Sequence, residues 1–338
     1  MAWSSIHAKL HTLLRQRVLL PKRSHILMAV SGGQDSLCLA RLFLDLQAKW
    51  DWQLGIIHCN HRWREDADDN ASHVVQLAKR WQLPVWVKTA GTPPESEAAA
   101  RAWRYGIFAG VAREKGFGHV VTGHTASDRA ETVLYNLIRG TSMDGVAALP
   151  WVRSLDTAQP AISLVRPLLS LTRAQTKEFC HQHQLPIWED SSNQNLSYRR
   201  NRIREELLPY LRTHFNPQVE RSLSQLAEIT TADILYIEEA ATALYQQTIV
   251  YLPEKETWEL QRDRLLKAPL ALQRRVIRQL LQNALPEPPN FHQVEKLVLL
   301  LPAPNGSKTD PYPGGWLAQV CKPVIHLTRP ENRQTPIS

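Results

Sequence analysis

The stretch that decides the fold is His25-Ile26-Leu27-Met28-Ala29-Val30-Ser31-Gly32-Gly33-Gln34-Asp35-Ser36-Leu37-Cys38-Leu39-Ala40. A short apolar run ends at Ser-Gly-Gly, and apolar residues then resume at helical spacing. This pattern predicts a buried strand, a tight turn and the first turn of a helix. Two adjacent glycines allow positive φ and a close approach of the backbone to a ligand. Backbone N–H groups at such a turn bind anions, most often phosphate. The lysine of the common G-x-x-x-x-G-K-[ST] loop is missing, so a different phosphate loop is expected.

Strands and helices alternate on both sides of this loop. Because strand–helix–strand units build parallel sheets, we expect an α/β fold whose parallel sheet carries helices on both faces. The expected strands after the loop are 54–60, 84–88 and 119–124, and the expected helices are 3–18, 36–50, 65–82, 95–115, 126–134 and 172–184, the last with Thr172 as N-cap. Residues 151–160 are expected to form a loop and 166–169 a short extended segment.

The second part of the chain has a different pattern. From about residue 216 the spacing is helical, with leucine-rich segments near 219–248, 261–283 and 290–301, and residues 315–327 alternate as in a short hairpin. We therefore predict a catalytic domain over 1–215 and a mainly helical domain over 216–338. A chain of 338 residues is long enough for two domains.

Composition narrows the class of protein. The net charge of +8 permits a polyanionic partner without proving one. The four cysteines at 38, 59, 180 and 321 show no metal-ligand spacing and suit reduced thiols in the cytoplasm, and no apolar run is long enough to cross a membrane. Residues 1–34 contain no acidic side chain, as in organelle transit peptides. The amphipathic pattern of 3–18 nevertheless favours a helix of the fold.

Four groups of residues are candidates for a functional site. Arg101 and Arg104 share a helix face and suit a phosphate clamp, although a solvated basic face is the alternative. His124 and Asp128 lie near one helix start and suit the same cleft. His58 and His61 follow a strand and suit the rim of that cleft better than a zinc site. The last group is a dense run of arginines that suits RNA phosphates better than a solvated face: Arg199, Arg200, Arg202 and Arg204.

Taken together, these motifs form a recognisable series. Ser31–Ser36 resembles the PP-loop of N-type ATP pyrophosphatases, which split ATP between its α and β phosphates. The whole ordered series resembles the tRNA(Ile)-lysidine synthetase family up to about residue 210: Ser31–Ser36, His58–Asp66, Ala100–Tyr105, Gly123–Asp128 with Glu131-Thr132, Arg139-Gly140, Arg166–Leu169, Glu189–Asn193 and Arg200–Arg204. The C-terminal part fits the tRNA-binding region of that family only in kind. Three positions depart from the usual pattern, namely Cys59, Trp63 and Arg129.

The resemblance implies an activity and a set of roles. ATP would adenylate the 2-oxo group of the wobble cytidine in an isoleucine tRNA with a CAU anticodon, and free L-lysine would then displace AMP. The expected ATP-binding residues are Ser31, Gly32, Gly33, Gln34, Asp35, Ser36, Arg101 and Arg104, with Mg²⁺ on Asp35. Asp35, Arg104, His124 and Asp128 are the expected catalytic residues, and the arginines at 199, 200, 202 and 204 are the expected tRNA contacts. A homodimer is compatible with the sequence.

Other functions remain open on sequence grounds. Cytidine 2-thiolation uses a similar loop on the same base, but the relatives that perform it carry paired cysteines that this chain lacks. GMP and NAD synthetases share Ser-Gly-Gly-x-Asp-Ser, but their other motifs are missing. A nucleotide-sensing RNA-binding protein without catalysis is a further alternative. Retention of Asp35, Arg104, His124 and Asp128 together favours an enzyme.

Overall fold

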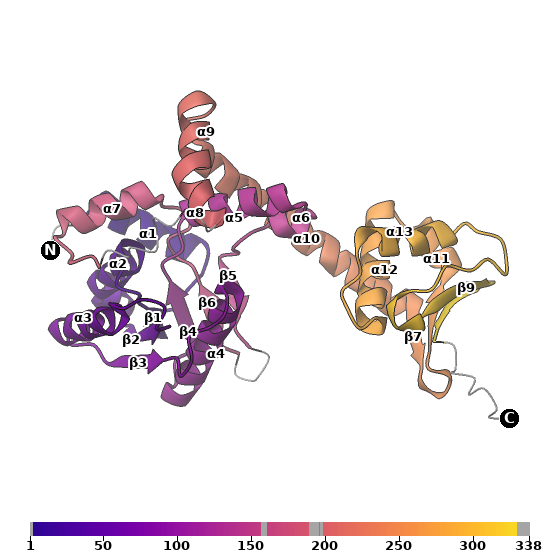
Figure 1. The fold of residues 1–338 in the computed structure, drawn as a ribbon, viewed down its shortest axis with the longest axis horizontal. Helices are drawn as coiled ribbons and strands as arrows, with labels where there is room; N and C mark the ends of the chain where they lie inside the picture. The colour runs from indigo at the N-terminus through magenta and orange to yellow at the C-terminus, as the bar shows by residue number, and fades with distance from the viewer. Residues whose placement is uncertain (1–2, 157–160, 189–195, 197–198, 330–338) are drawn as a thin grey trace. The chain divides into compact units, whose positions relative to one another are not determined.

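The computed structural model describes residues 3–156, 161–188, 196 and 199–329 (Figure 1). The chain forms two compact units, Met1–Thr231 and Ala232–Ser338. The first unit extends beyond residue 215, where the sequence predicts the boundary, and the division falls within the long helix α10 (Val219–Thr248). The motif segment Glu189–Asn193 lies outside the described residues.

The first unit is organised around a six-stranded sheet in the order β3-β2-β1-β4-β6-β5. All neighbouring strands are parallel except the pair β5 and β6, so the predicted parallel sheet is confirmed. The antiparallel edge strand β5 lies in a stretch expected to be a loop. The strands are β1 (His25–Ala29), β2 (Gln53–Asn60), β3 (Val85–Thr89), β4 (His119–Thr122), β5 (Val152–Ser154) and β6 (Ser163–Val165).

Helices cover both faces of this sheet, as the alternation of elements predicts (Figure 1). Residues of β1 alternate between two cores: Ile26 and Met28 pack with α1, α2, α3 and α7, whereas Leu27 packs with α4. Helix α1 places Leu10 and Leu14 in the first core, so it is part of this fold. The helices are α1 (Ser5–Gln16), α2 (Gln34–Trp50), α3 (Ala67–Arg80), α4 (Glu97–Lys115), α5 (Ala126–Arg139), α6 (Met143–Val146), α7 (Arg173–Gln182), α8 (Arg199–Arg202), a π-helical turn (Ile203–Leu207) and α9 (Leu208–His214).

The second unit combines helices with an antiparallel sheet in the order β7-β8-β10-β9. The hairpin of β9 (Leu317–Cys321) and β10 (Val324–Thr328) confirms the predicted one. The strands β7 (Ile249–Leu252) and β8 (Thr257–Gln261) are not predicted by the sequence analysis, although the β-branched and aromatic run Ile249-Val250-Tyr251 suits a strand. Helices α11 (Arg262–Lys267), α12 (Leu270–Ala284) and α13 (Phe291–Leu300) complete the unit.

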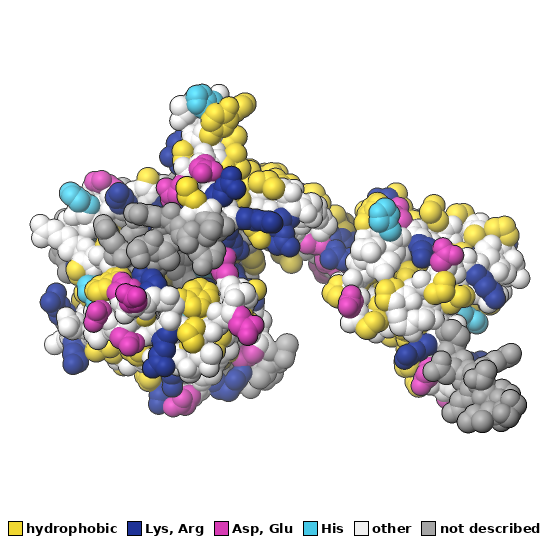
Figure 2. Space-filling view, viewed as in Figure 1, with side chains coloured by type: hydrophobic (Ala, Val, Ile, Leu, Met, Phe, Trp, Pro, Cys, Tyr) yellow, Lys and Arg dark blue, Asp and Glu magenta, His cyan; other side chains and the backbone are white. Residues whose placement is uncertain are grey.

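The charge of the surface and the hydropathy of the helices are two further properties of the structure. Figure 2 shows lysine and arginine side chains spread over the visible face of both units, with acidic side chains between them. In the part of the chain that the structure describes, no helix is both long and apolar enough to span a bilayer.

Candidate active site

The phosphate loop joins the carboxyl end of β1 to the first turn of α2. Gly33 is the N-cap of α2 and contributes no side-chain cap, so the first N–H groups of the helix remain for a ligand. Ser36 holds the loop closed: its hydroxyl donates to the Gly33 carbonyl at 2.9 Å and accepts from the Ser31 N–H at 3.1 Å. Asn70 of α3 donates to the Ser31 carbonyl at 3.0 Å. The loop is therefore a preformed turn with N–H groups available to an anion.

Two glycines make this close packing possible. Gly32 has a φ of +90°, which side-chain-bearing residues rarely adopt, and a Cβ there would collide with the Asn70 amide oxygen. Gly123 follows β4, and a Cβ there would stand 2.8 Å from the backbone carbonyl carbon and oxygen of Asp35. Because backbone atoms cannot move aside as a flexible side chain can, only glycine at 123 lets β4 and the start of α2 approach so closely.

Asp35 lies in the first turn of α2 within a network contributed by α7. Its carboxylate accepts hydrogen bonds from Thr176 and, at 3.3 Å, from Gln34, and Arg173 stands 3.9 Å away. Burial raises the pKa of the Asp35 carboxyl, and the charge of Asp128 raises it further. Because the charge of Asp128 disfavours the ionised form of Asp35, a cation beside Asp35 would be stabilised.

The second carboxylate cluster lies at the start of α5. One oxygen of Asp128 closes the capping box of the helix, accepting from the Thr125 N–H at 2.7 Å and its hydroxyl at 2.8 Å. Glu131, one turn further on, is 5% exposed and forms a two-pronged pair with Arg204, with Nε–Oε1 and Nη2–Oε2 distances of 2.7 and 2.8 Å. Arg204 also stands 3.6 Å from Asp128.

Burial affects the pKa values of both Glu131 and Arg204. Burial raises the pKa of the Glu131 carboxyl despite the opposing effect of Arg204. Burial by itself would lower the pKa of the Arg204 guanidinium, but the hydrogen bonds and charge of Glu131 outweigh it and raise that pKa. Each group therefore stabilises the charged form of the other.

Arginines form the opposite, electropositive side of the site. Arg101 of α4 lies over the Tyr105 ring at 5.0 Å, and Arg153 lies over the same ring at 4.4 Å. Burial lowers the pKa of Arg101, and the neighbouring arginines lower it further. Arg166 is 1% exposed, and burial lowers its pKa to about 10. Such a cluster of cations suits a highly charged anion.

His124 is close enough to both charged groups for each to affect its pKa. Burial lowers its pKa to about 3, the charge of Asp128 opposes the shift, and Arg166, Arg101 and Arg104 add to it. The ring is therefore neutral at physiological pH. Its Nδ1 is hydrogen-bonded to the Thr122 hydroxyl at 2.8 Å, which leaves Nε2 for a ligand. A neutral imidazole of so low a pKa is better suited to orient a substrate by a hydrogen bond than to accept a proton.

The structure separates the four arginines that the sequence groups together. Arg199 and Arg202 are exposed, and Arg202 pairs with Glu206 one turn away at 3.4 Å. Arg200 pairs with Glu97 of α4. Arg204 is paired with the buried Glu131, so its environment differs from that of Arg199 and Arg202, and its contact with RNA phosphates stays a prediction. Four positions spread over six consecutive helical residues cannot all share one face, and the environments of the four arginines differ accordingly.

Several functional candidates are missed by the sequence analysis. Glu131 is quoted there only as part of a motif, and its buried pairing becomes visible only with Arg204 in place. Gln34 and Asp35 are predicted, but their partners come from a helix some 140 positions later. Arg166 is likewise quoted there only as part of a motif. The side chains around the loop and the arginine cluster that are not named there are Asn70, Arg153, Arg173 and Thr176.

The structure also describes the surroundings of His58 and Arg129, which the sequence analysis singled out. His58 is buried and its Nδ1 is hydrogen-bonded to the Val30 carbonyl at 2.8 Å. Among the described residues, no group of three or more His, Cys, Asp or Glu could hold a metal ion. The unusual Arg129 is 1% exposed and donates two hydrogen bonds to the Leu149 carbonyl, so this departure serves internal packing.

Comparisons with known proteins agree with this geometry. A model of the PP-loop domain matches residues 3–211, and this fold and loop place the chain in the PP-loop class. A model of the TilS substrate binding domain matches residues 260–322. A tRNA(Ile)-lysidine synthase from Nostoc sp. is 51% identical over 98% of this chain and 99% of its own length, and one from Synechocystis sp. is 47% identical over 95% and 96%. The chain belongs to the tRNA(Ile)-lysidine synthase family, a family of ligases that form a C–N bond, and the resemblance based on the ordered motifs is confirmed.

More distant relatives extend the comparison. A chloroplastic tRNA(Ile)-lysidine synthase from Zygnema circumcarinatum is 35% identical over 86% of this chain and 78% of its own length. Among solved structures, a U34-tRNA thiolase from Methanococcus maripaludis with its [4Fe-4S] cluster is 18% identical, with a TM-score of 0.53, and covers 66% of this chain and 78% of its own. At that identity the likeness shows the fold alone.

Proposed function

We propose that this protein joins free L-lysine to C2 of the wobble cytidine in an isoleucine tRNA with a CAU anticodon, in the cytoplasm and at the expense of ATP. In the first step the cytidine 2-oxo oxygen attacks the α-phosphorus and pyrophosphate leaves. In the second step the lysine ε-nitrogen attacks C2, AMP leaves with the former 2-oxo oxygen, and the amine gives up its protons. The observation that carries the proposal is the phosphate loop facing a pair of carboxylates, in a chain that matches its relatives over nearly their full length.

The loop and the arginines suit the first step. The N–H groups at Gly33 and the start of α2 would bind the departing pyrophosphate, while Arg101 and Arg104 would stabilise charge on the α-phosphate. Asp35 fits a Mg²⁺ ion, because it is a carboxylate beside the phosphate loop whose own charge is disfavoured by Asp128. When bound there, Mg²⁺ would neutralise phosphate charge.

The carboxylates suit the second step. The ε-ammonium of free lysine has a pKa of about 10.4 and must lose a proton before it can attack. The second oxygen of Asp128 is not used in the capping box and lies 3.6 Å from Arg204, and this oxygen would hold the ammonium. The arginines that lower the pKa of His124 would lower that of the lysine amine in the same way. His124, being neutral, would orient the adenylated base through Nε2.

A labelling assay tests the function. The full-length protein is incubated with ATP, Mg²⁺, radiolabelled lysine and the tRNA transcript. We expect label in the tRNA, and none when the wobble cytidine is replaced by uridine. Pyrophosphate without incorporated lysine would refute lysine ligation and retain PP-loop chemistry, as expected for a thiolation enzyme. Neither product would favour a protein that binds RNA without catalysis.

A further inference from the structure

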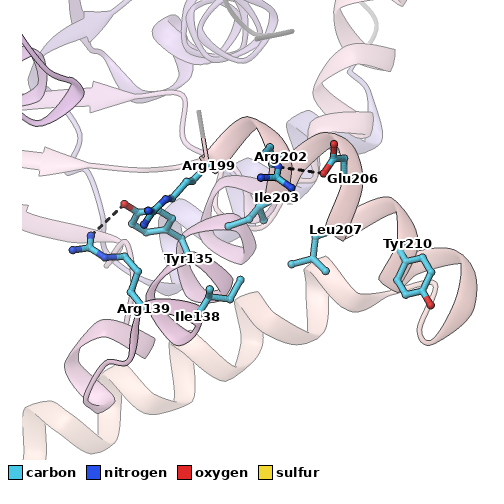
Figure 3. A pocket seen from close by; sticks show the side chains of 9 residues that line it. All are labelled: Tyr135, Ile138, Arg139, Arg199, Arg202, Ile203, Glu206, Leu207 and Tyr210. Carbon is cyan, nitrogen blue, oxygen red and sulfur yellow. Dashed lines mark hydrogen bonds and ion pairs between the residues drawn. The ribbon is translucent and has the colours of Figure 1, made fainter. Parts of the chain in front are cut away.

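A separate cavity of about 620 Å³ opens beside the carboxylate cluster, between α5 and the segment from α8 to α9 (Figure 3). Its volume is typical of sites for small molecules. Figure 3 shows Tyr135, Arg139 and Arg199 at one end, Tyr210 at the other and aliphatic side chains between them. The lining residues are Tyr135, Ile138, Arg139, Arg199, Arg202, Ile203, Glu206, Leu207 and Tyr210.

The lining has the chemistry of a site for a nucleotide. Tyr210 is 55% exposed, and its ring lies against those of His214 at 4.6 Å and Phe215 at 5.9 Å, so it is braced on one side. Ile138 is 67% exposed and offers an apolar wall. Unstacked bases in RNA loops bind on aromatic rings of this kind.

The charge of the cavity favours the same ligand. Three arginines line it against one carboxylate, Glu206, which is paired with Arg202 at 3.4 Å. Arg139 stays close to Tyr135, with its guanidinium 5.2 Å from the ring centre and 3.2 Å from the hydroxyl. An apolar floor with a cationic rim complements a nucleobase that carries a phosphate, and it is poorly suited to an acidic or uncharged peptide.

The cavity also lies near enough to Asp128 and Glu131 for a single RNA strand to reach both places. Tyr135 follows Asp128 by two turns of α5, so the two side chains share one helix face and their backbones are about 10 Å apart. On the other wall, Ile203 and Leu207 flank Arg204, which pairs with Glu131. About three stacked nucleotides, or fewer when the strand is unstacked and extended, span a distance of this order.

We propose that this cavity binds one unstacked nucleobase of the anticodon loop, the neighbour of the wobble cytidine on one side. The proposal rests on the proposed function, since it assumes that the wobble cytidine occupies the adjacent site. The base would stack on Tyr210, and its flanking phosphate would contact Arg199. These two contacts would open the anticodon loop and hold the cytidine away from its neighbours. Because stacking and phosphate contacts are tolerant of base identity, the cavity would position the anticodon loop without choosing between bases.

Kinetic analysis of substitutions at Tyr210 tests the proposal in the full-length protein. We expect Tyr210→Ala to raise KM for tRNA about tenfold, the effect typical of losing one stacked base, while KM for ATP stays the same. Tyr210→Phe, which keeps the ring, should retain the native KM. Trp3→Ala is the control, because Trp3 is an aromatic residue of the first unit that is 47% exposed and does not line the cavity.

Substrates that lack one base identify the ligand. Two tRNAs are made abasic at the nucleotide directly 5′ or directly 3′ of the wobble cytidine. For one of them, native protein and Tyr210→Ala should have equal KM values, because the stacked base is already missing. The proposal is overturned if Tyr210→Ala leaves KM for tRNA unchanged, or if its effect persists on both abasic tRNAs, as contact with the backbone or with a protein partner would predict. The native protein must form lysidine in each experiment, which separates this test from that of the proposed function.

Discussion

Replacing Arg204 should damage this protein far more than replacing Arg202, two residues away. Arg204→Met leaves Glu131 with 5% exposure and without the partner that it contacts at 2.7 and 2.8 Å. Breaking a buried pair in this way costs about 3–5 kcal/mol, and the cost here lies near 3 kcal/mol because Glu131, whose pKa is already raised by burial, can take up a proton. Arg202→Met removes an exposed pair with Glu206, which is worth about 0.5 kcal/mol or less.

Urea unfolding followed by tryptophan fluorescence measures this difference. Of the eleven tryptophans, only Trp258 and Trp316 lie in the second unit, so the signal reports chiefly on the first. The double variant Arg204→Met with Glu131→Gln should recover most of the lost stability, because no buried charge remains unpaired. It should stay inactive in lysine ligation, since the carboxylate cluster is dismantled. Equal costs for Arg204→Met and Arg202→Met would refute the assignment of Arg204 to the interior.

Three further outcomes follow from the same structure. Asp35→Asn should abolish activity yet raise the melting temperature at pH 7. The pKa of the Asp35 carboxyl is raised in the fold, so its ionisation lowers the stability of the native state as the pH rises above about 4. The stability advantage of the variant should therefore vanish below that pH. A lower melting temperature of the variant at pH 7 would contradict this reasoning. Gly123→Ala should cost about 1–3 kcal/mol in urea unfolding, because its Cβ meets the Asp35 backbone, whereas Gly110→Ala, with no atom within 4 Å, should be neutral or stabilising. The affinity for tRNA should fall steeply with salt, and Arg199→Ala should reduce the logarithmic slope by about one if it contacts a phosphate.

Much of the fold can be predicted from local patterns in the sequence. The apolar run at 25–30, the glycine turn and the helical spacing after it describe β1, the phosphate loop and α2 almost as they stand. The N-cap at Thr172 is visible as well, and the structure shows the full capping box with Gln175. These features depend on residues within a few positions of each other, so one segment contains all the information needed. The strands β7 and β8 escape detection because they are short and lie between strongly helical segments.

The residues of the candidate site likewise divide into those that the sequence predicts and those that only the fold brings together. Sequence alone predicts the phosphate loop, Asp35, and the His124 and Asp128 pair, because each belongs to a compact motif at the end of a strand. It also predicts the arginines of α4, because their spacing puts them on one face of a helix. Which of the later arginines is buried is decided by the fold, since Arg204 meets Glu131 across 73 positions of the chain. The contact between Thr176 and Asp35 spans 141 positions and exists only once α7 packs on α2. Charge and burial of a side chain depend on everything packed around it, so pairing partners, raised and lowered pKa values and the cavity beside α5 become visible only in the tertiary structure.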